Sequence, residues 1–314
     1  MTTMIKGKLL RILESDRMLA HSGESISAEL GVSRVTIWKH IQKLQELGYK
    51  IDSTPKGYQL NESPDIPFPW EMTGREESVF YYPEVTSTMD LAKEMARQGA
   101  QHLSVIVAER QNKGRGRLSR RWVSKDGGLY FTVILRPQVP LNLAGRYNFA
   151  ASVALVKVFR ELYQVEAHVK WPNDILINEK KLCGMISEVD AAEDMVAFLN
   201  IGIGINANND PTPEEANATS LCNVLGRQVN RQKILASFLE IFDNTIQNQT
   251  LDDIIMEWKE HTITLNRQVK IVTTRDTHEG RAVDIDEDGA LILEQADNSL
   301  LKVVYGDCFH QSWD

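Results

Sequence analysis

The chain has 314 residues, of which 42% are hydrophobic and 25% are charged, and its formal net charge is −8. The length favours two or three domains, and the composition is that of a soluble globular protein. The negative net charge excludes a protein that coats nucleic acid with its whole surface. The charge is uneven, however, because residues 1–60 contain nine Lys and Arg against six Asp and Glu, which gives +3 and leaves −11 for the remainder. This division favours an N-terminal module that faces nucleic acid, followed by an acidic body.

Signals for a membrane span or for disulfides are absent from the sequence. No apolar run approaches the roughly 20 residues of a membrane span, and the first residues lack the apolar stretch of a signal peptide. Cys183, Cys222 and Cys308 are scattered and form no CxxC pair, which argues against a disulfide framework and against a zinc site. We therefore expect a cytoplasmic protein with reduced thiols, no membrane contact and no metal bound by its own side chains.

The first sixty residues carry the pattern of three short helices and a hairpin. Apolar residues at helical spacing predict the first helix, whose inner face comprises Ile5, Leu9, Ile12 and Leu13. Ser25 is expected to cap a second helix that ends at Gly31, and Ser33 is expected to cap a third helix that stops at Gly48. Alternating residues on either side of 53–56 predict the hairpin.

This N-terminal stretch resembles the winged helix-turn-helix domains of bacterial repressors. In such a domain the third helix enters the major groove of DNA and the hairpin forms the wing. We expect Trp38 to pack against the wing or the linker, and not against a base. The residues expected to contact DNA are Ser33, Arg34, Thr36, Lys39, His40 and Lys43. The alternative is a three-helix protein–protein module with a basic surface.

Three prolines separate this module from the rest of the chain. Pro64, Pro67 and Pro69 lie in a stretch without periodicity, which predicts a semi-rigid connector because proline blocks regular structure. We therefore expect a DNA-binding domain at 1–63, a linker at 64–77, a catalytic domain at 78–263 and a C-terminal domain at 264–314.

Beyond the linker, short apolar strands alternate with helical patterns, which predicts an α/β domain with a mixed sheet in a multidomain α+β protein. Strands are expected at 79–81, 105–109, 129–135, 174–178, 181–189 and 198–206. Helices are expected from about 88, at 144–163, at 231–246 and at 251–261. The last fifty residues predict a small β-barrel with strands at 269–273, 280–285, 290–294 and 300–304.

A basic loop joins two of the predicted strands. Gln111–Trp122 reads QNKGRGRLSRRW and holds five cationic residues and two glycines. Glycine lets the backbone approach a ligand, successive backbone N–H groups favour anions, and arginine donates two parallel hydrogen bonds to phosphate or carboxylate. The pattern favours a loop that closes over a phosphate-bearing ligand, and a solvated basic turn is the alternative.

Two further polar strings interrupt the strands. They are TSTMD at Thr86–Asp90 and a longer string at Val169–Glu188 that contains KWPND and KKLCGMISE. With the basic loop, their order and spacing resemble biotin protein ligases, specifically the bifunctional ligase and biotin-operon repressor with an N-terminal winged helix. The resemblance covers essentially the whole chain. It implies a class II synthetase-like catalytic domain and an SH3-like C-terminal barrel.

The resemblance implies a two-step reaction. The carboxylate of biotin attacks the α-phosphate of ATP in the presence of Mg²⁺, which gives biotinyl-5′-adenylate and pyrophosphate. A lysine of a biotin carboxyl carrier protein then attacks the mixed anhydride. The first step gathers anions and therefore needs cations, whereas the second needs a carboxylate that takes or orients the proton of the acceptor lysine. A homodimer that binds operator DNA is implied as well.

The resemblance also assigns roles to residues of the three strings. The catalytic residues would be Arg115, Lys181, Asp174 and Lys170. The biotin-binding residues would be Ser87, Thr88, Gln111, Gly114, Arg115, Gly116, Arg117, Lys181 and Gly184. The nucleotide-binding residues would be Arg117, Trp122, Asn173 and Asn206.

Two positions depart from the family pattern. Met89 stands where the family commonly has a small polar residue, and Leu118–Ser119 replaces a glycine-containing continuation of the loop. Two other functions remain open, a winged-helix regulator that only senses a small molecule and a lipoate-type ligase of related fold. The GRGR and KWPND strings favour biotin over lipoate.

Overall fold

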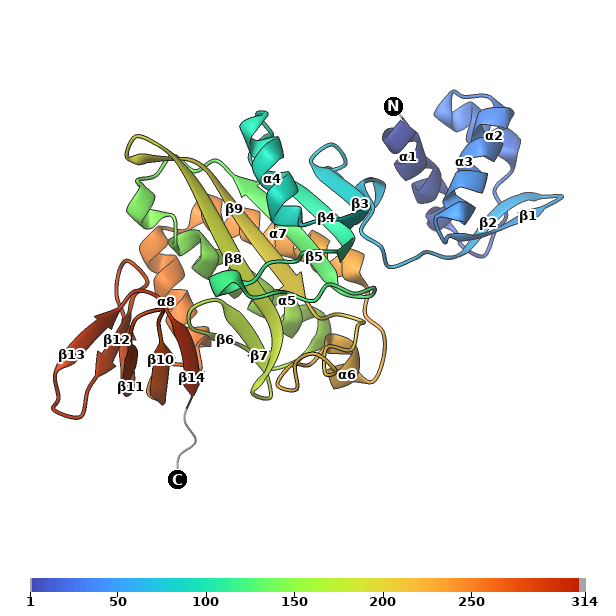
Figure 1. The fold of residues 1–314 in the computed structure, drawn as a ribbon. Helices are drawn as coiled ribbons and strands as arrows, with labels where there is room; N and C mark the ends of the chain where they lie inside the picture. Colours follow the sequence, from blue (N-terminus) through green and yellow to red (C-terminus); the bar gives the residue numbers. More distant parts are fainter. Residues whose placement is uncertain (1, 311–314) are drawn as a thin grey trace. The chain divides into compact units, whose positions relative to one another are not determined.

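A computed structural model describes residues 2–310 of the chain (Figure 1). The chain folds as two compact units, which divide between Phe80 and Tyr81. No helix in the described part of the chain is both long enough and apolar enough to cross a bilayer.

The first unit has the helix-turn-helix and hairpin predicted from the sequence. Its elements are α1 (Thr2–Ser15), α2 (Gly23–Leu30), α3 (Arg34–Glu46), β1 (Lys50–Thr54) and β2 (Gly57–Glu62). The buried core between the helices comprises Leu9, Leu13, Ile26, Ile37, Ile41 and Leu44. These residues recur at helical spacing, so each helix buries one face and leaves the other polar.

The caps of α2 and α3 fix the turn between them. Ser22, and not Ser25, caps α2, since the Ser22 hydroxyl accepts from the Ser25 N–H at 3.0 Å. The prediction of Ser25 was wrong because the helix begins earlier than its apolar residues suggest. Gly31 ends α2 with φ of 65°, and Ser33 caps α3 by accepting from the Thr36 N–H at 3.1 Å, both as predicted.

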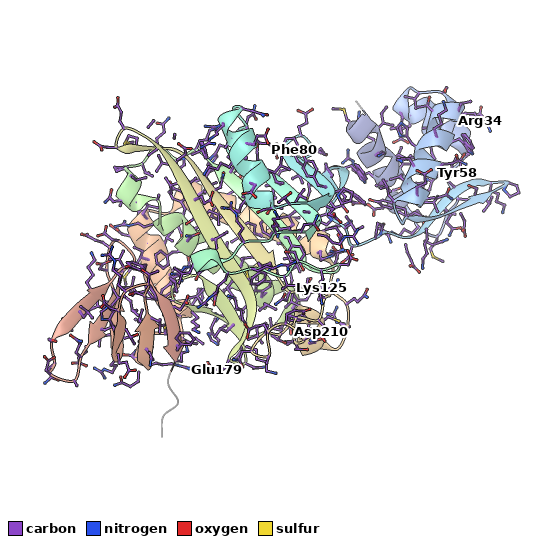
Figure 2. The ribbon with its side chains drawn as sticks, viewed as in Figure 1. Arg34, Tyr58, Phe80, Lys125, Glu179 and Asp210 are labelled. Atoms are coloured by element: carbon purple, nitrogen blue, oxygen red, sulfur yellow. The ribbon has the colours of Figure 1, made fainter. Side chains whose placement is uncertain are left out.

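The wing is fastened to the loop between α1 and α2. Tyr58, labelled on β2 in Figure 2, donates its N–H to the His21 carbonyl at 2.9 Å and accepts from the His21 N–H at 2.8 Å. Gly57 precedes it with φ of 135°, and a Cβ there would lie 2.1 Å from the His21 oxygen. Only glycine fits this close approach of two backbones.

The proline-rich stretch after the wing packs on the first unit. It contains a short 3-10 helix, Pro69–Glu71, and Phe68, the residue before this helix, is 2% exposed and stacks on Trp70 with ring centroids 4.7 Å apart. The Lys6 ammonium of α1 lies 4.2 Å from the Trp70 ring centroid. Burial, followed by the nearby Lys43 charge, lowers the pKa of Lys6.

The second unit is built on a mixed sheet with strand order β3-β4-β5-β9-β8-β7-β6 (Figure 1). Its strands are β3 (Val79–Val85), β4 (Ser104–Gln111), β5 (Leu129–Leu135), β6 (Ala167–Lys170), β7 (Asp174–Ile177), β8 (Lys180–Ala192) and β9 (Met195–Ile205). From β4 to β6 all neighbours are antiparallel. Its helices are α4 (Thr88–Arg97), α5 (Arg146–Tyr163), α6 (Leu221–Leu225), α7 (Arg231–Asn248) and α8 (Leu251–His261).

The two faces of the sheet are covered differently. On β5, Phe131 packs edge-on against Phe238 of α7 with ring centroids 5.3 Å apart. Ile134, at a position of the opposite parity, belongs to the cluster that α4 makes with Ala92 and Ala96. Because successive strand residues point to opposite faces, α4 and α7 lie on opposite sides of the sheet.

The C-terminal segment forms an antiparallel sheet of order β13-β12-β11-β10-β14. Its strands are β10 (Gln268–Val272), β11 (Thr277–Ile285), β12 (Leu291–Glu294), β13 (Leu300–Val303) and β14 (Asp307–His310). The first four were predicted. The strand β14 was missed because its apolar residues, Cys308 and Phe309, are adjacent and give no alternation.

Candidate active site

A cavity of about 580 Å³ lies on the α4 face of the sheet, and its floor is backbone. Gly184 of β8 pairs with Gly204 of β9, and Gly202 lies on the same face two residues earlier. A Cβ at Gly204 would lie 2.5 Å from ring atoms of Trp122, and a Cβ at Gly202 would lie 2.7 Å from the Met89 sulfur. The glycines therefore let Trp122 and Met89 lie against the sheet as walls of the cavity.

One end of the cavity carries a buried hydrogen-bonded cluster. The Thr88 N–H and hydroxyl both donate to Gln111 Oε1, at 2.8 Å and 3.1 Å. Gln111 Nε2 donates to Ser124 Oγ at 2.9 Å, and the Thr132 hydroxyl donates to Thr88 Oγ1 at 2.9 Å. This chain of bonds orients the Gln111 amide, so that Thr88 and Gln111 present fixed polar groups to a ligand.

Ser87 has an unused hydroxyl at the same end. It occupies the N-cap position of α4, yet its side chain makes no capping bond. The residue is 2% exposed, and its Oγ has no hydrogen-bond partner within residues 2–310. Leaving a buried hydroxyl unpaired costs about 1–3 kcal/mol, so this atom is positioned for a polar group of a ligand.

The basic loop folds back on itself beside the cavity. The Trp122 N–H donates to the Gly114 carbonyl at 2.9 Å, and the Gly116 N–H donates to the Arg120 carbonyl at 2.8 Å. A Cβ at Gly114 would lie 2.4 Å from the Trp122 carbonyl oxygen, so only glycine fits there. Leu118 has φ of 51°, a region in which glycine is unstrained, at the position where the sequence lacked the expected glycine.

Two carboxylates hold Arg115. Its guanidinium lies 2.9 Å from Asp90 on α4 and 2.8 Å from Glu188 on β8. The side chain remains 38% exposed, and it lines the cavity. Arg115 is therefore oriented at the rim by residues of two different elements, with part of its donor capacity still open to solvent.

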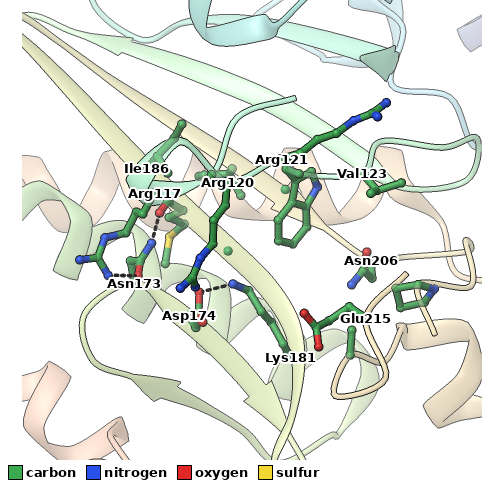
Figure 3. A pocket seen from close by; sticks show the side chains of 18 of the residues that line it. Arg117, Arg120, Arg121, Val123, Asn173, Asp174, Lys181, Ile186, Asn206 and Glu215 are labelled. Carbon is green, nitrogen blue, oxygen red and sulfur yellow. Dashed lines mark hydrogen bonds and ion pairs between the residues drawn. The ribbon is translucent and has the colours of Figure 1, made fainter. Parts of the chain in front are cut away.

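Arg117 is held more deeply. It donates to Asn173 Oδ1 at 3.1 Å (Figure 3), and it also donates to the Gly306 carbonyl at 3.1 Å. Burial lowers the pKa of Arg117, and the Asp307 and Asp174 carboxylates oppose that shift. The guanidinium keeps its charge at neutral pH because its ordinary pKa exceeds about 12. The loop thus supplies a partly buried cation that does not depend on pH.

Lys181 and Asp174 form an ion pair inside the cavity. The Lys181 ammonium lies 2.7 Å from Asp174 Oδ1 and 5.5 Å from the centroid of the Trp122 ring (Figure 3). Asp174 begins β7 and Lys181 lies on β8, so the turn between these strands brings the two together. Asn206 follows β9 on the far side of Lys181, with Glu215 beside it.

The C-terminal domain contributes to the same cavity through β14. Asp307 pairs with Arg120 of the basic loop, and Lys170 lies 6.0 Å from the ring centroid of Phe309. His310 also lines the cavity, and burial, followed by the Lys170 and Arg267 charges, lowers its pKa to about 4. This contribution was not expected, since β14 was not predicted from the sequence.

The charges of the cavity suit a ligand with several negative groups. Arg117, Lys170 and Lys181 line it together with the cationic rim of the loop. Residues 2–310 hold no group of three or more His, Cys, Asp and Glu side chains able to bind a metal. The lining carboxylates include Asp174 and Glu215, and Mg²⁺ commonly takes one or two protein carboxylates together with phosphate and water oxygens.

The predicted DNA-binding residues differ in exposure. Arg34, Lys39 and Lys43 lie at the surface of α3, whereas His40 is half-buried. Burial, followed by the Lys6 charge, lowers the pKa of His40. The Ser33 hydroxyl is engaged in the cap described above and lies 2.9 Å from the hydroxyl of Thr36.

Comparison with known proteins covers both units. Residues 6–59 match an HTH domain, residues 81–206 the biotin/lipoate A/B protein ligase family, and residues 264–311 the biotin protein ligase C-terminal domain. The bifunctional ligase/repressor BirA of Bacillus subtilis is 34% identical over 90% of this chain and 91% of its own length. The chain belongs to the BirA family of bifunctional ligase/repressors. The Escherichia coli member is 30% identical over 92% of each chain.

Solved structures of the ligase part agree with this family. A biotin protein ligase from Aquifex aeolicus in complex with biotin and ATP has a TM-score of 0.63 and is 25% identical. It covers 75% of this chain, and 99% of its own length is matched. A biotin protein ligase from Leishmania major in complex with biotin has a TM-score of 0.52 and is 25% identical.

The structure brings the residues predicted for this BirA-family site into one place. All the predicted catalytic, biotin-binding and nucleotide-binding residues except Gly114 line the single cavity described above. Gly114 does not line the cavity, but its carbonyl accepts from the N–H of the lining residue Trp122. Sequence reasoning missed the lining residues Arg120, Arg121, Asp307 and His310. The first two belong to the predicted basic loop and were recognisable as candidates by their charge.

Proposed function

We propose that the chain is an ATP-dependent biotin protein ligase that also acts as a DNA-binding repressor of biotin genes. The observation that carries the proposal is the single cavity that joins a buried hydrogen-bonding cluster, a basic loop and a lysine–carboxylate pair. A match to bifunctional ligase/repressors over 90% of the chain supports it. The protein would work in the cytoplasm, with the domain boundaries expected from the sequence.

In the first step the cavity would gather biotin and ATP. Ser87, Thr88 and Gln111 would bind the ureido ring, whose N–H and C=O groups need both acceptors and donors. Arg115, Arg117 and Lys181 would hold the biotin carboxylate against the α-phosphate and stabilise the charge that builds up there. The carboxylate oxygen forms the new bond to phosphorus, and pyrophosphate leaves with the electron pair of the broken bond.

The nucleotide would occupy the other end of the cavity. Trp122 offers an aromatic face and Asn206 an amide, while Asn173 keeps Arg117 oriented toward the phosphates. Lys170 would approach the phosphates from β6. Mg²⁺ would enter with ATP, and the lining carboxylates Asp174 and Glu215 would supply the one or two protein ligands that it takes beside phosphate and water.

In the second step a lysine of a carrier protein would attack the mixed anhydride. The amine must lose a proton to attack, since an unperturbed lysine has a pKa of about 10.4. Asp174 would accept or orient that proton, and Lys181 would hold the carboxylate in place. The amide bond forms at the biotin carbonyl carbon, and AMP leaves with the electrons of the former anhydride bond.

Repression would use the first unit. Arg34, Lys39 and Lys43 on the exposed side of α3 supply charge for the DNA backbone, and a homodimer would present two such helices to a two-fold site. Binding that falls with salt but does not discriminate among duplexes would count against repression, because counterion release alone produces it.

The decisive experiment is a transfer assay with the full chain. The protein is incubated with ATP, Mg²⁺, radiolabelled biotin and a biotin carboxyl carrier domain. We expect label on the carrier and none when its acceptor lysine is replaced by arginine. Labelling by lipoate in place of biotin would reassign the substrate, and no labelling by either would leave a sensor that only binds its ligand.

A further inference from the structure

The exposed face of α3 carries two large apolar side chains. Val35 is 62% exposed and Trp38 is 47% exposed, although the helix buries Ile37 and Ile41 on its inner side. The expectation that Trp38 packs against the wing or linker stays a prediction. Single exposed hydrophobic residues are ordinary, but two adjoining ones on the second helix of a helix-turn-helix require an account.

The neighbours of this pair are cationic. On a helix, residues four apart lie next to each other, so Trp38 adjoins Arg34 and Val35 adjoins Lys39. Arg34 and Lys39 are both exposed, and Figure 2 shows the Arg34 side chain on the surface of α3. The face thus presents apolar surface bordered by positive charge, on a stretch of the chain whose net charge is positive.

Duplex DNA has the complementary surface. Its backbones are lines of negative charge, and between them the major groove exposes the 5-methyl groups of thymine, the apolar spots among its donors and acceptors. The first two turns of the recognition helix are the part that reaches base edges, and Val35 and Trp38 lie there. Arg34 and Lys39 then face phosphates on either side of the groove.

We propose that Val35 and Trp38 read thymine in the operator through contact with its 5-methyl group, whereas Arg34 and Lys39 supply affinity without sequence preference. This assignment rests on the proposed repressor function. It adds two apolar residues to the polar residues of α3 that were expected from the sequence to contact DNA.

The test begins with the full chain in the presence of biotin and ATP. Its preferred site is selected from a library of random duplexes, and the selected duplex is resynthesised with single thymines replaced by deoxyuridine, which removes only the methyl group. We expect about a fourfold loss of affinity for each contacted methyl, since burying one such group contributes about 0.8 kcal/mol. Fluorescence anisotropy measures the loss.

Variants assign the effect to the two side chains. In Val35→Ala and Trp38→Ala the affinity ratio between thymine and deoxyuridine duplexes should fall toward one, while the salt dependence stays that of the native chain. Lys39→Ala should weaken both duplexes equally and reduce the salt dependence. Met18→Ala, which truncates a side chain that is 86% exposed outside α3, is the matched control and should retain the native ratio.

The outcomes separate the two claims. The thymine contact is overturned if a site is selected but removing its methyl groups has no effect. It is also overturned if both alanine variants still discriminate thymine from deoxyuridine as the native chain does. Either result leaves repression standing. No selected sequence at all overturns repression together with the contact. A change of oligomeric state in Trp38→Ala with unchanged discrimination would show that the apolar pair covers another copy of the chain. Circular dichroism and unchanged carrier labelling establish that each variant folds.

Discussion

The Nζ atom of Lys181 lies 2.7 Å from Oδ1 of Asp174, and both residues line the cavity. The pair places one positive and one negative group in the site of the proposed reaction. Adenylate formation needs the cation, and transfer to the carrier lysine needs the proton acceptor. Replacing Lys181 by methionine keeps the length of the side chain and removes its charge. We expect adenylate formation to slow by about 10²- to 10³-fold, the usual loss for one donor to developing charge. The rate of pyrophosphate release measures the rate of adenylate formation.

Lys180 provides the matched control for this change. It is the neighbouring residue on β8, it is exposed, and it does not line the cavity. Lys180→Met should retain the native rate, and a native rate in Lys181→Met as well would remove Lys181 from the mechanism. Asp174→Asn tests the carboxylate separately, since transfer from preformed adenylate should suffer more than adenylate formation.

Arg115 should slow the release of biotinyl-adenylate from the enzyme. It holds a position at the rim between Asp90 and Glu188, from which its guanidinium can reach a bound anion. A hydrogen bond to a charged group contributes about 1.5–3 kcal/mol, so Arg115→Ala should release biotinyl-adenylate roughly 10- to 100-fold faster. Filtration of the enzyme after one turnover separates free from bound intermediate. The control is Lys113→Ala, which lies in the same loop but outside the cavity lining and should retain biotinyl-adenylate as the native chain does. Equal retention in both variants would contradict the proposed role of Arg115.

Local pattern predicted most of the fold, because the buried strands and helices repeat their apolar residues at regular spacing. The limits 129–135 and 251–261 agree with β5 and α8. Prediction failed where apolar spacing does not mark the first residue of a helix, and where a contact distant in sequence decides. Ser22 caps α2 although Ser25 stands closer to the apolar residues, and β14 forms only because β10 offers it a partner.

The site was predicted from its strings of polar residues, but its geometry was not. Spacing along the chain indicates that Gln111, Lys181 and Asn206 fall near strand ends, whereas their meeting in one cavity depends on the strand order. The two carboxylates that hold Arg115 come from α4 and β8, far apart in sequence, so no local pattern links them.

Gly204 should be indispensable for nucleotide binding. A methyl group there would overlap the Trp122 ring, with 2.5 Å to its nearest atoms, and Trp122 is fixed by its backbone bond to Gly114. We expect Gly204→Ala to displace the ring and raise the KM for ATP more than that for biotin. Gly145→Ala, where an added Cβ meets no atom within 4 Å, is the control. An unchanged KM for ATP in Gly204→Ala would show that Trp122 does not contact the nucleotide.

A buried ion pair should hold the base of the basic loop. Arg231 Nη1 lies 2.7 Å from Glu109 Oε1, and it donates to the Gly128 carbonyl at 2.8 Å. Arg231→Met would leave the Glu109 carboxylate uncompensated, which costs about 3–5 kcal/mol of unfolding free energy. Urea unfolding measures the loss, and adding Glu109→Gln should restore most of it.

The control for that pair is an exposed one. Arg97 and Asp190 pair with side chains 61% and 35% exposed, so Arg97→Met should cost less than about 1 kcal/mol. Similar losses in Arg97→Met and Arg231→Met would mean that burial does not distinguish the two pairs. It would also remove the reason to regard Arg231 as an anchor of the loop.

Stability should fall in acid partly through His310. Its pKa in the folded protein is about 4, because burial, Lys170 and Arg267 disfavour the imidazolium, whereas an unfolded histidine has a pKa of about 6.5. Between these values the unfolded chain binds more protons than the folded one, so the unfolding free energy decreases as pH falls from about 6.5 to about 4. Above about pH 7 both states are neutral and the effect vanishes. His310→Gln cannot take up the proton, so its Tm should fall less than that of the native protein over that interval. Above about pH 7 the two curves of Tm against pH should run parallel. Parallel curves throughout would show that His310 does not titrate differently in the two states.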